Sequence, residues 1–92
     1  MTIVWSPTAV EDLNHLHAYI EQQNPGATAK VASAILRRVE SLNDFPGQGR
    51  PGRLPHTREL IIPDTPFFVV YKAMGKTIQI ITGLHSARKW PQ

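Results

Sequence analysis

Three β-rich segments in the second half of the chain are joined by very short connections, and this arrangement constrains the fold more than any other feature. The segments are RELII (58–62), PFFVVYKAM (66–74) and TIQIITGL (77–84). A Pro-Asp-Thr-Pro turn (63–66) separates the first two, and Gly75-Lys76 fits a two-residue hairpin turn between the last two. Parallel crossovers need far longer connections, so we expect these strands to pair antiparallel.

The first half of the chain has helical rather than strand-like periodicity. Residues 2–5 (TIVW) are expected to form a short strand, and Ser6-Pro7 is typical of a helix N-cap followed by proline at the first helical position. Glu11 and Asp12 lie near that end, where the helix dipole favours acidic residues. Apolar residues then recur on one helical face: Ala9, Leu13, Leu16 and Ile20.

A second helix is predicted after Asn24-Pro25, which repeats the pattern of a cap followed by proline. Its apolar face consists of Val31, Ile35, Val39 and Leu42. The segment 43–57 ends this helix with three prolines and three glycines, and we expect it to lack regular structure. The whole chain, residues 1–92, is thus predicted to be one α+β domain of order β-α-α-β-β-β, with a helical hairpin on one face of an antiparallel sheet.

The predicted core combines the apolar faces of the helices with inward-facing strand positions. It consists of Trp5, Leu13, Leu16, Ile20, Val31, Ile35, Val39, Val69 and Ile80. Consecutive apolar residues in FFVVY (67–71) indicate burial on both faces of that strand. The helices cover only one face, so the other needs the loop at 45–57, the C-terminal tail, or a second chain.

The charge of the chain is unevenly divided. Residues 1–49 hold three Lys/Arg and five Asp/Glu, a net −2, whereas residues 50–92 hold seven and two, a net +5. A positive field in the second half favours acidic partners, either nucleic acid or an acidic protein. The chain has no cysteine and no apolar run long enough to span a bilayer, and we expect a cytoplasmic protein that does not contact membranes.

Cationic residues gather on either side of the predicted β-rich segments. Arg50, Arg53, His56 and Arg58 come before or at the second strand, and His85, Arg88 and Lys89 follow the last. If the fold brings these ends together, His or a carboxylate would move protons and Arg would balance phosphate charge in metal-free RNA cleavage. The alternative is that the arginines belong to a solvated loop and that Arg58 and Glu59 make cross-strand pairs. The histidines do not have the spacing of a metal site, and neither a metal nor a cofactor is predicted.

Six segments, in this order and spacing, resemble the RelE/ParE superfamily of bacterial toxins over essentially the whole chain. They are VWSPTAVEDLNHLHAYI, NPGATA, FPGQGRPGR, TREL, TPFFVVY and LHSARKWP. The resemblance implies a type II toxin–antitoxin pair, in which a small cognate antitoxin masks the toxin in a hetero-oligomer. It also implies one of two activities: RelE-like cleavage of messenger RNA on the ribosome, or ParE-like inhibition of DNA gyrase.

Departures from the RelE pattern favour the ParE-like interpretation. RelE-type nucleases commonly carry a catalytic Arg where this chain has Phe68, and residues 45–57 contain Arg but no Lys. His85 matches a histidine found in both groups, so it does not distinguish them. The alternatives are a RelE-like endoribonuclease and an inactive relative that acts as a binding module.

The resemblance and the charge pattern together assign roles to individual residues. If the protein is a nuclease, the predicted catalytic residues are His85, Arg88 and Arg58. The predicted target- or nucleic-acid-binding residues are Arg50, Arg53, His56, Lys89 and Trp90. The predicted antitoxin-binding residues are Phe68, Val70 and Ile81 on the doubly apolar strand and its neighbour.

Overall fold

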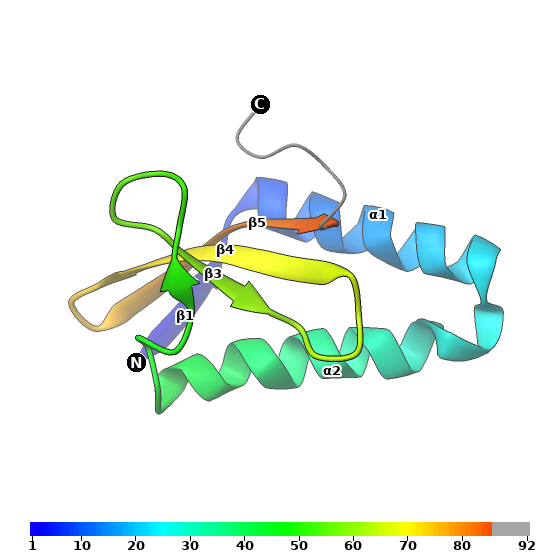
Figure 1. Cartoon of the computed structure of the whole chain (residues 1–92), viewed down its shortest axis with the longest axis horizontal. Coiled ribbons are helices and arrows are strands. Elements are labelled where there is room, and N and C mark those ends of the chain that lie inside the picture. The colour runs from blue at the N-terminus through cyan, green and yellow to red at the C-terminus, as the bar shows by residue number, and fades with distance from the viewer. Residues whose placement is uncertain (86–92) are drawn as a thin grey trace.

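The computed structural model describes residues 1–85, which form two helices and a five-stranded sheet (Figure 1). In chain order the elements are β1 (Thr2–Trp5), α1 (Pro7–Gln23), η1 (Pro25–Ala27), α2 (Thr28–Glu40), η2 (Ser41–Asn43), β2 (Arg50–Pro51), β3 (Arg58–Ile61), β4 (Phe67–Met74) and β5 (Thr77–His85). The strand order across the sheet is β1-β5-β4-β3-β2. The predicted α+β class is confirmed.

Two features of the sheet differ from the sequence prediction. β1 pairs with β5 in parallel, because the chain passes through both helices before it returns to the sheet and so has room for a crossover. The segment expected to be irregular contains the two-residue strand β2, which pairs antiparallel with β3. The three long strands pair as predicted, and Gly75, with φ 59°, begins the two-residue turn between β4 and β5.

The start of α1 follows the sequence signal and also ties the helix to the sheet. The Ser6 hydroxyl accepts the Ala9 N–H at 2.9 Å, as an N-cap does, and donates to the Ile81 carbonyl at 2.8 Å. The backbone N–H of Ser6 donates to the Ile80 carbonyl at 2.9 Å. The helix therefore begins beside the part of β5 that lies beyond the end of β1.

The second helix begins later than predicted. Pro25 opens the short 3₁₀ turn η1, Asn24 makes no side-chain capping bond, and the α-helix starts at Thr28. α1 and α2 run in opposite directions, joined by this turn (Figure 1). No helix within residues 1–85 has the length and hydropathy needed to cross a membrane.

The predicted core residues lie in the core or against it. Ile20, Ile35, Val39, Val69 and Ile80 are buried, while Trp5, Leu13, Leu16 and Val31 are partly buried and pack on the same cluster. β4 is buried on both faces, as its sequence predicted: Phe67–Tyr71 are all buried. Phe67, Val69 and Tyr71 join the helix-side core, whereas Phe68 and Val70 form a second cluster on the opposite face.

Tyr71 joins this strand to the loop that precedes β2. Its hydroxyl donates to the Pro46 carbonyl at 2.7 Å and accepts the Gly49 N–H at 3.0 Å. A Cβ on residue 49 would lie 2.8 Å from the Tyr71 ring, so this close approach requires glycine. One fully buried hydroxyl thus fixes the path of the loop.

Removing this hydroxyl should destabilise the domain. We expect Tyr71→Phe to lower the free energy of unfolding by about 1–3 kcal/mol, because the Pro46 carbonyl and the Gly49 N–H lose their shared partner. Tyr19→Phe is the matched control: Tyr19 is 50% exposed, and the change should stay within about 0.5 kcal/mol. Urea denaturation of both variants measures the difference, and equal midpoints would contradict the role of Tyr71.

Candidate functional site

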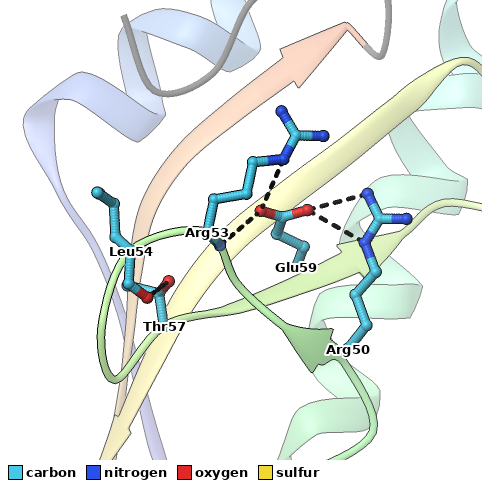
Figure 2. A network of polar contacts seen from close by, with 5 residues as sticks. All are labelled: Arg50, Arg53, Leu54, Thr57 and Glu59. Carbon is cyan, nitrogen blue, oxygen red and sulfur yellow. Dashed lines mark hydrogen bonds and ion pairs between the residues drawn. The ribbon is translucent and has the colours of Figure 1, made fainter.

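A buried carboxylate on β3 organises the loop at 45–57, which carries Arg50 and Arg53 and is called the cationic loop below. Glu59 is 2% exposed, and its Oε1 accepts from Arg50 Nε at 3.1 Å and from Arg50 Nη2 at 2.9 Å. Its Oε2 accepts the backbone N–H of Arg53 at 3.2 Å and lies 3.7 Å from Arg53 Nε (Figure 2). A buried carboxylate is costly unless it is paired and hydrogen-bonded, and these four contacts supply both conditions.

Local backbone geometry brings the two arginines to Glu59. Arg50 lies directly opposite Glu59 in the β2–β3 register, and a tight loop then returns the chain to β3. In that loop the Gly52 N–H donates to the Thr57 carbonyl at 2.8 Å, and the Thr57 hydroxyl donates to the Leu54 carbonyl at 2.7 Å. A Cβ at residue 52 would collide with Thr57, so glycine is required there.

The arginines also cover part of the sheet face opposite α1 and α2. The guanidinium carbons of Arg50 and Arg53 each lie 5.9 Å from the centroid of the Phe68 ring. Phe68 is 1% exposed and packs with Val70 and Leu84, against which Ile81 also packs. Part of the cover that the second face of β4 needs therefore comes from the protein's own loop, and of the predicted antitoxin-binding residues only Ile81 retains exposure.

A separate groove lies on the helix side, at the end of β5. It has a volume of about 440 Å³ and is lined by Asp12, His15, Leu16, Tyr19, Phe67, Gly83 and His85. The His85 ring makes edge-to-face contacts with Phe67 and Tyr19, at centroid distances of 5.4 Å and 6.4 Å. The imidazole is therefore held between a strand and a helix rather than projecting freely from the end of the sheet.

Asp12 fixes the wall of this groove. Its Oδ2 accepts a short hydrogen bond from the Thr82 hydroxyl and a second from the Gly83 N–H at 3.2 Å. The sequence suggested only a helix-dipole role for this carboxylate. Its true partners lie about 70 residues away in the chain, and no local pattern points to them.

The predicted catalytic residues are not brought together within the described part of the chain. Arg58 pairs with Tyr71 in the middle of β4, whereas His85 pairs with Phe67 at the start of that strand, four residues away. Four residues of strand span roughly 13 Å. Arg58 Nη1 instead donates to the Gly49 carbonyl at 2.8 Å. Arg88, which was predicted to join them, lies outside residues 1–85.

The predicted binding residues are spread over two places. Arg50 and Arg53 lie together over Phe68, while His56 is exposed in the loop between β2 and β3 with φ 64°. Lys89 and Trp90 lie outside the described residues. No group of three or more His, Cys, Asp or Glu side chains in residues 1–85 is arranged to hold a metal ion.

Sequence reasoning missed Glu59 as the centre of the polar network. It expected Arg58 and Glu59 to make cross-strand pairs, and Glu59 does pair across β2 and β3 with Arg50. It did not expect the Glu59 carboxylate to be buried on the face of the sheet that holds Phe68 and Val70. The sequence did contain a signal for this pairing. Glu59 lies inside the strand segment RELII, and a charged residue is rarely buried unless it is paired. Tyr19 was missed as a neighbour of His85, since no sequence pattern joins α1 to the end of β5.

Comparison with known proteins identifies a family. Residues 3–90 match the family model described as ParE toxin of type II toxin-antitoxin system, parDE. The chain is 38% identical over 90 residues to a protein of Sinorhizobium fredii named putative toxin Y4kP, covering 98% of this chain and 93% of that one. It is 27% identical over 86 residues to Toxin RelE2 of Caulobacter vibrioides, covering 94% and 96%.

Solved structures agree on the fold. A chain of the chromosomal ParDE TA system from P. aeruginosa superposes with a TM-score of 0.83 at 27% identity, covering 92% of this chain and 95% of that one. The YoeB dimer from Staphylococcus aureus gives a TM-score of 0.57 at 21% identity, covering 89% and 92%, and shares the fold alone.

The wall of the groove can be tested by comparing two adjacent carboxylates. We expect Asp12→Ala to lower the free energy of unfolding by about 1–3 kcal/mol, because the Thr82 hydroxyl and the Gly83 N–H lose their acceptor. Glu11→Ala should change it by less than about 0.5 kcal/mol, since that side chain is 71% exposed and lies 4.0 Å from His15 Nε2. Thermal unfolding of both variants checks this, and a Glu11 effect as large as that of Asp12 would contradict it.

Proposed function

The chain belongs to the ParE toxin family of type II toxin–antitoxin systems, and from this premise we propose that it arrests bacterial growth by inhibiting DNA gyrase. Membership in that family implies a cognate antitoxin as its partner. The proposed activity is a binding activity, in which the toxin acts on an enzyme instead of hydrolysing a substrate itself.

The separation of Arg58 from His85 is the observation that supports a non-hydrolytic toxin. Cleavage of RNA without a metal needs a proton-transfer group and a cation within hydrogen-bond reach of the same phosphate. Arg58 and His85 pair with residues four positions apart on β4, and the Arg58 guanidinium is engaged with the loop carbonyl of Gly49. Phe68, at the position where RelE-type nucleases commonly have an arginine, lies buried beneath two guanidinium groups.

A RelE-like ribonuclease is the second candidate. The 27% identity to Toxin RelE2 of Caulobacter vibrioides favours it, together with a histidine at the edge of an open groove. One induced culture separates this candidate from gyrase inhibition and from an inactive binding module. A ribonuclease cuts messenger RNA, a gyrase inhibitor causes breaks in DNA, and an inactive module does neither.

Induced expression of the chain in bacteria should arrest growth and produce trapped, cleaved DNA with induction of the DNA-damage response. Messenger RNA should stay intact, since a gyrase inhibitor does not cut RNA. Co-expression of the adjacent small open reading frame should restore growth. The measurements are growth curves, DNA breaks and mapped RNA ends from the same culture.

Each alternative has its own outcome in that culture. Codon-positioned RNA cuts that disappear in His85→Ala would mean that the chain is a ribonuclease and would rule out the proposed gyrase inhibition. Normal growth in the presence of soluble, folded protein would rule out both toxic activities, and an inactive binding module would be the remaining candidate.

A further inference from the structure

The outer side of α2 carries an apolar residue in an open depression. The buried residues of this helix are Thr28, Ile35 and Val39, whereas Leu36 is 48% exposed. A depression of about 580 Å³ lies on the outer side, and the described residues that line it are all exposed members of α2: Ala29, Lys30, Ser33, Leu36 and Arg37. Figure 1 shows α2 along one edge of the molecule, where a partner can lie alongside it.

Two cations line this depression and are available to a partner. Within residues 1–85 the side chains of Lys30 and Arg37 make no ion pair and no hydrogen bond, whereas the neighbouring Arg38 donates to the Ile61 carbonyl at 3.3 Å. Seven residues make almost two helical turns, so the two cations lie on one side of α2, about 10 Å apart along its axis. Glu40 is also exposed and leaves this part of the helix with a net charge of +1.

The spacing of the two cations favours a helical partner over an extended one. A helix that runs alongside α2 presents the same face every seven residues, so two carboxylates at that spacing can meet both cations. In a strand, about 10 Å corresponds to three residues, and side chains three residues apart point to opposite faces. Ala29 and Ser33 are small enough for close approach, and Leu36 offers an apolar contact to such a helix.

We propose that the outer side of α2 binds an acidic amphipathic helix of the cognate antitoxin. Lys30 and Arg37 lie opposite two of its carboxylates, and Leu36 packs against its apolar face. The inference rests on membership in the ParE toxin family, which implies that partner. It places antitoxin contacts on the helix layer, whereas the sequence predicted them on the sheet.

Two other occupants fit this surface less well. A second copy of the chain would bring the cations of one α2 close to those of the other, and like charges repel. Proteins that bind nucleic acid typically engage about 6–10 phosphates and stack single-stranded bases on exposed aromatic rings. The depression has two cations, and none of the described residues that line it is aromatic.

The test is the dissociation constant of the purified full-length chain for its cognate antitoxin, measured at low and high salt. Lys30→Glu/Arg37→Glu should raise this constant by about tenfold or more, with the larger effect at low salt, because two attractive contacts become repulsive. Leu36→Ala should raise it on the order of fivefold at both salt concentrations, since salt does not screen an apolar contact.

An exchange of charges tests the helix and its spacing. Pairs of acidic residues seven positions apart in the antitoxin are replaced by lysine, one pair at a time. One such pair should restore affinity for Lys30→Glu/Arg37→Glu and weaken binding to the wild-type chain. Restoration only by residues at a different spacing would contradict a helix that lies along α2.

Matched controls separate this surface from general charge and from stability. Lys76→Glu reverses a charge at an exposed position in the turn between β4 and β5. Val10→Ala shortens an apolar side chain on α1 at a residue that is 46% exposed, close to the 48% of Leu36. Both changes should leave the dissociation constant within about twofold of the wild-type value, because neither residue lies on α2. Unfolding curves of all variants identify any change in fold.

Specific results would overturn the proposal. Effects of the folded α2 variants no larger than those of Lys76→Glu and Val10→Ala would refute the docking surface, while growth arrest by the wild-type chain would still support the proposed function. Loss of self-association, or of binding to a short DNA duplex, with unchanged antitoxin affinity would assign the surface to a different partner. A wild-type chain that binds the antitoxin through α2 but does not arrest growth would refute the proposed function alone.

Discussion

Burial of β4 on both faces is the constraint on which the rest of this structure depends. Five consecutive residues, Phe67–Tyr71, are buried, so the strand needs an apolar cover on each side. The helical hairpin supplies one cover, packing Ile35 and Val39 with the inward side chains of the sheet. Among residues 1–85 the two-helix layer has no counterpart on the opposite face, where a turn-rich loop contributes to the cover.

That second cover determines the chemistry of the cationic loop. A loop of glycines and prolines offers little apolar surface, so the arginine side chains lie over Phe68 while their charged groups stay at the surface. The buried carboxylate of Glu59 holds them there, and the Tyr71 hydroxyl anchors the same loop from the helix side. β4 thus fixes both how the loop packs and where the guanidinium groups of Arg50 and Arg53 lie.

Two positions along β4 lie beside different surfaces, and this bears on how a ParE-family toxin works. Arg58 pairs with the middle of the strand and donates to the Gly49 carbonyl of the loop, whereas His85 pairs with the start of the strand and lies against Tyr19 beside an open groove. A binding protein can use two separate surfaces for two partners, such as an antitoxin and a target enzyme. A nuclease needs its groups at one phosphate, and so this division supports a toxin that acts by binding.

The sequence by itself determined the features that depend on near neighbours. Ser6 and Pro7 start a helix, Gly75 begins a hairpin turn, and consecutive apolar residues bury a strand on both faces, because each effect acts over a few residues. The order of elements and the resemblance to toxins followed from these local patterns. The boundary of α2 was missed by three residues, since Asn24 and Pro25 form a separate turn.

Only the tertiary structure decided which distant residues meet. The pairing of Glu59 with Arg50 depends on the register of β2 against β3, which places the two residues directly opposite each other. The contact of Asp12 with Thr82 depends on the packing of α1 against β5, next to the irregularity in strand pairing at Val70. Register and packing are properties of the assembled sheet and the layer above it, and no short stretch of sequence encodes them.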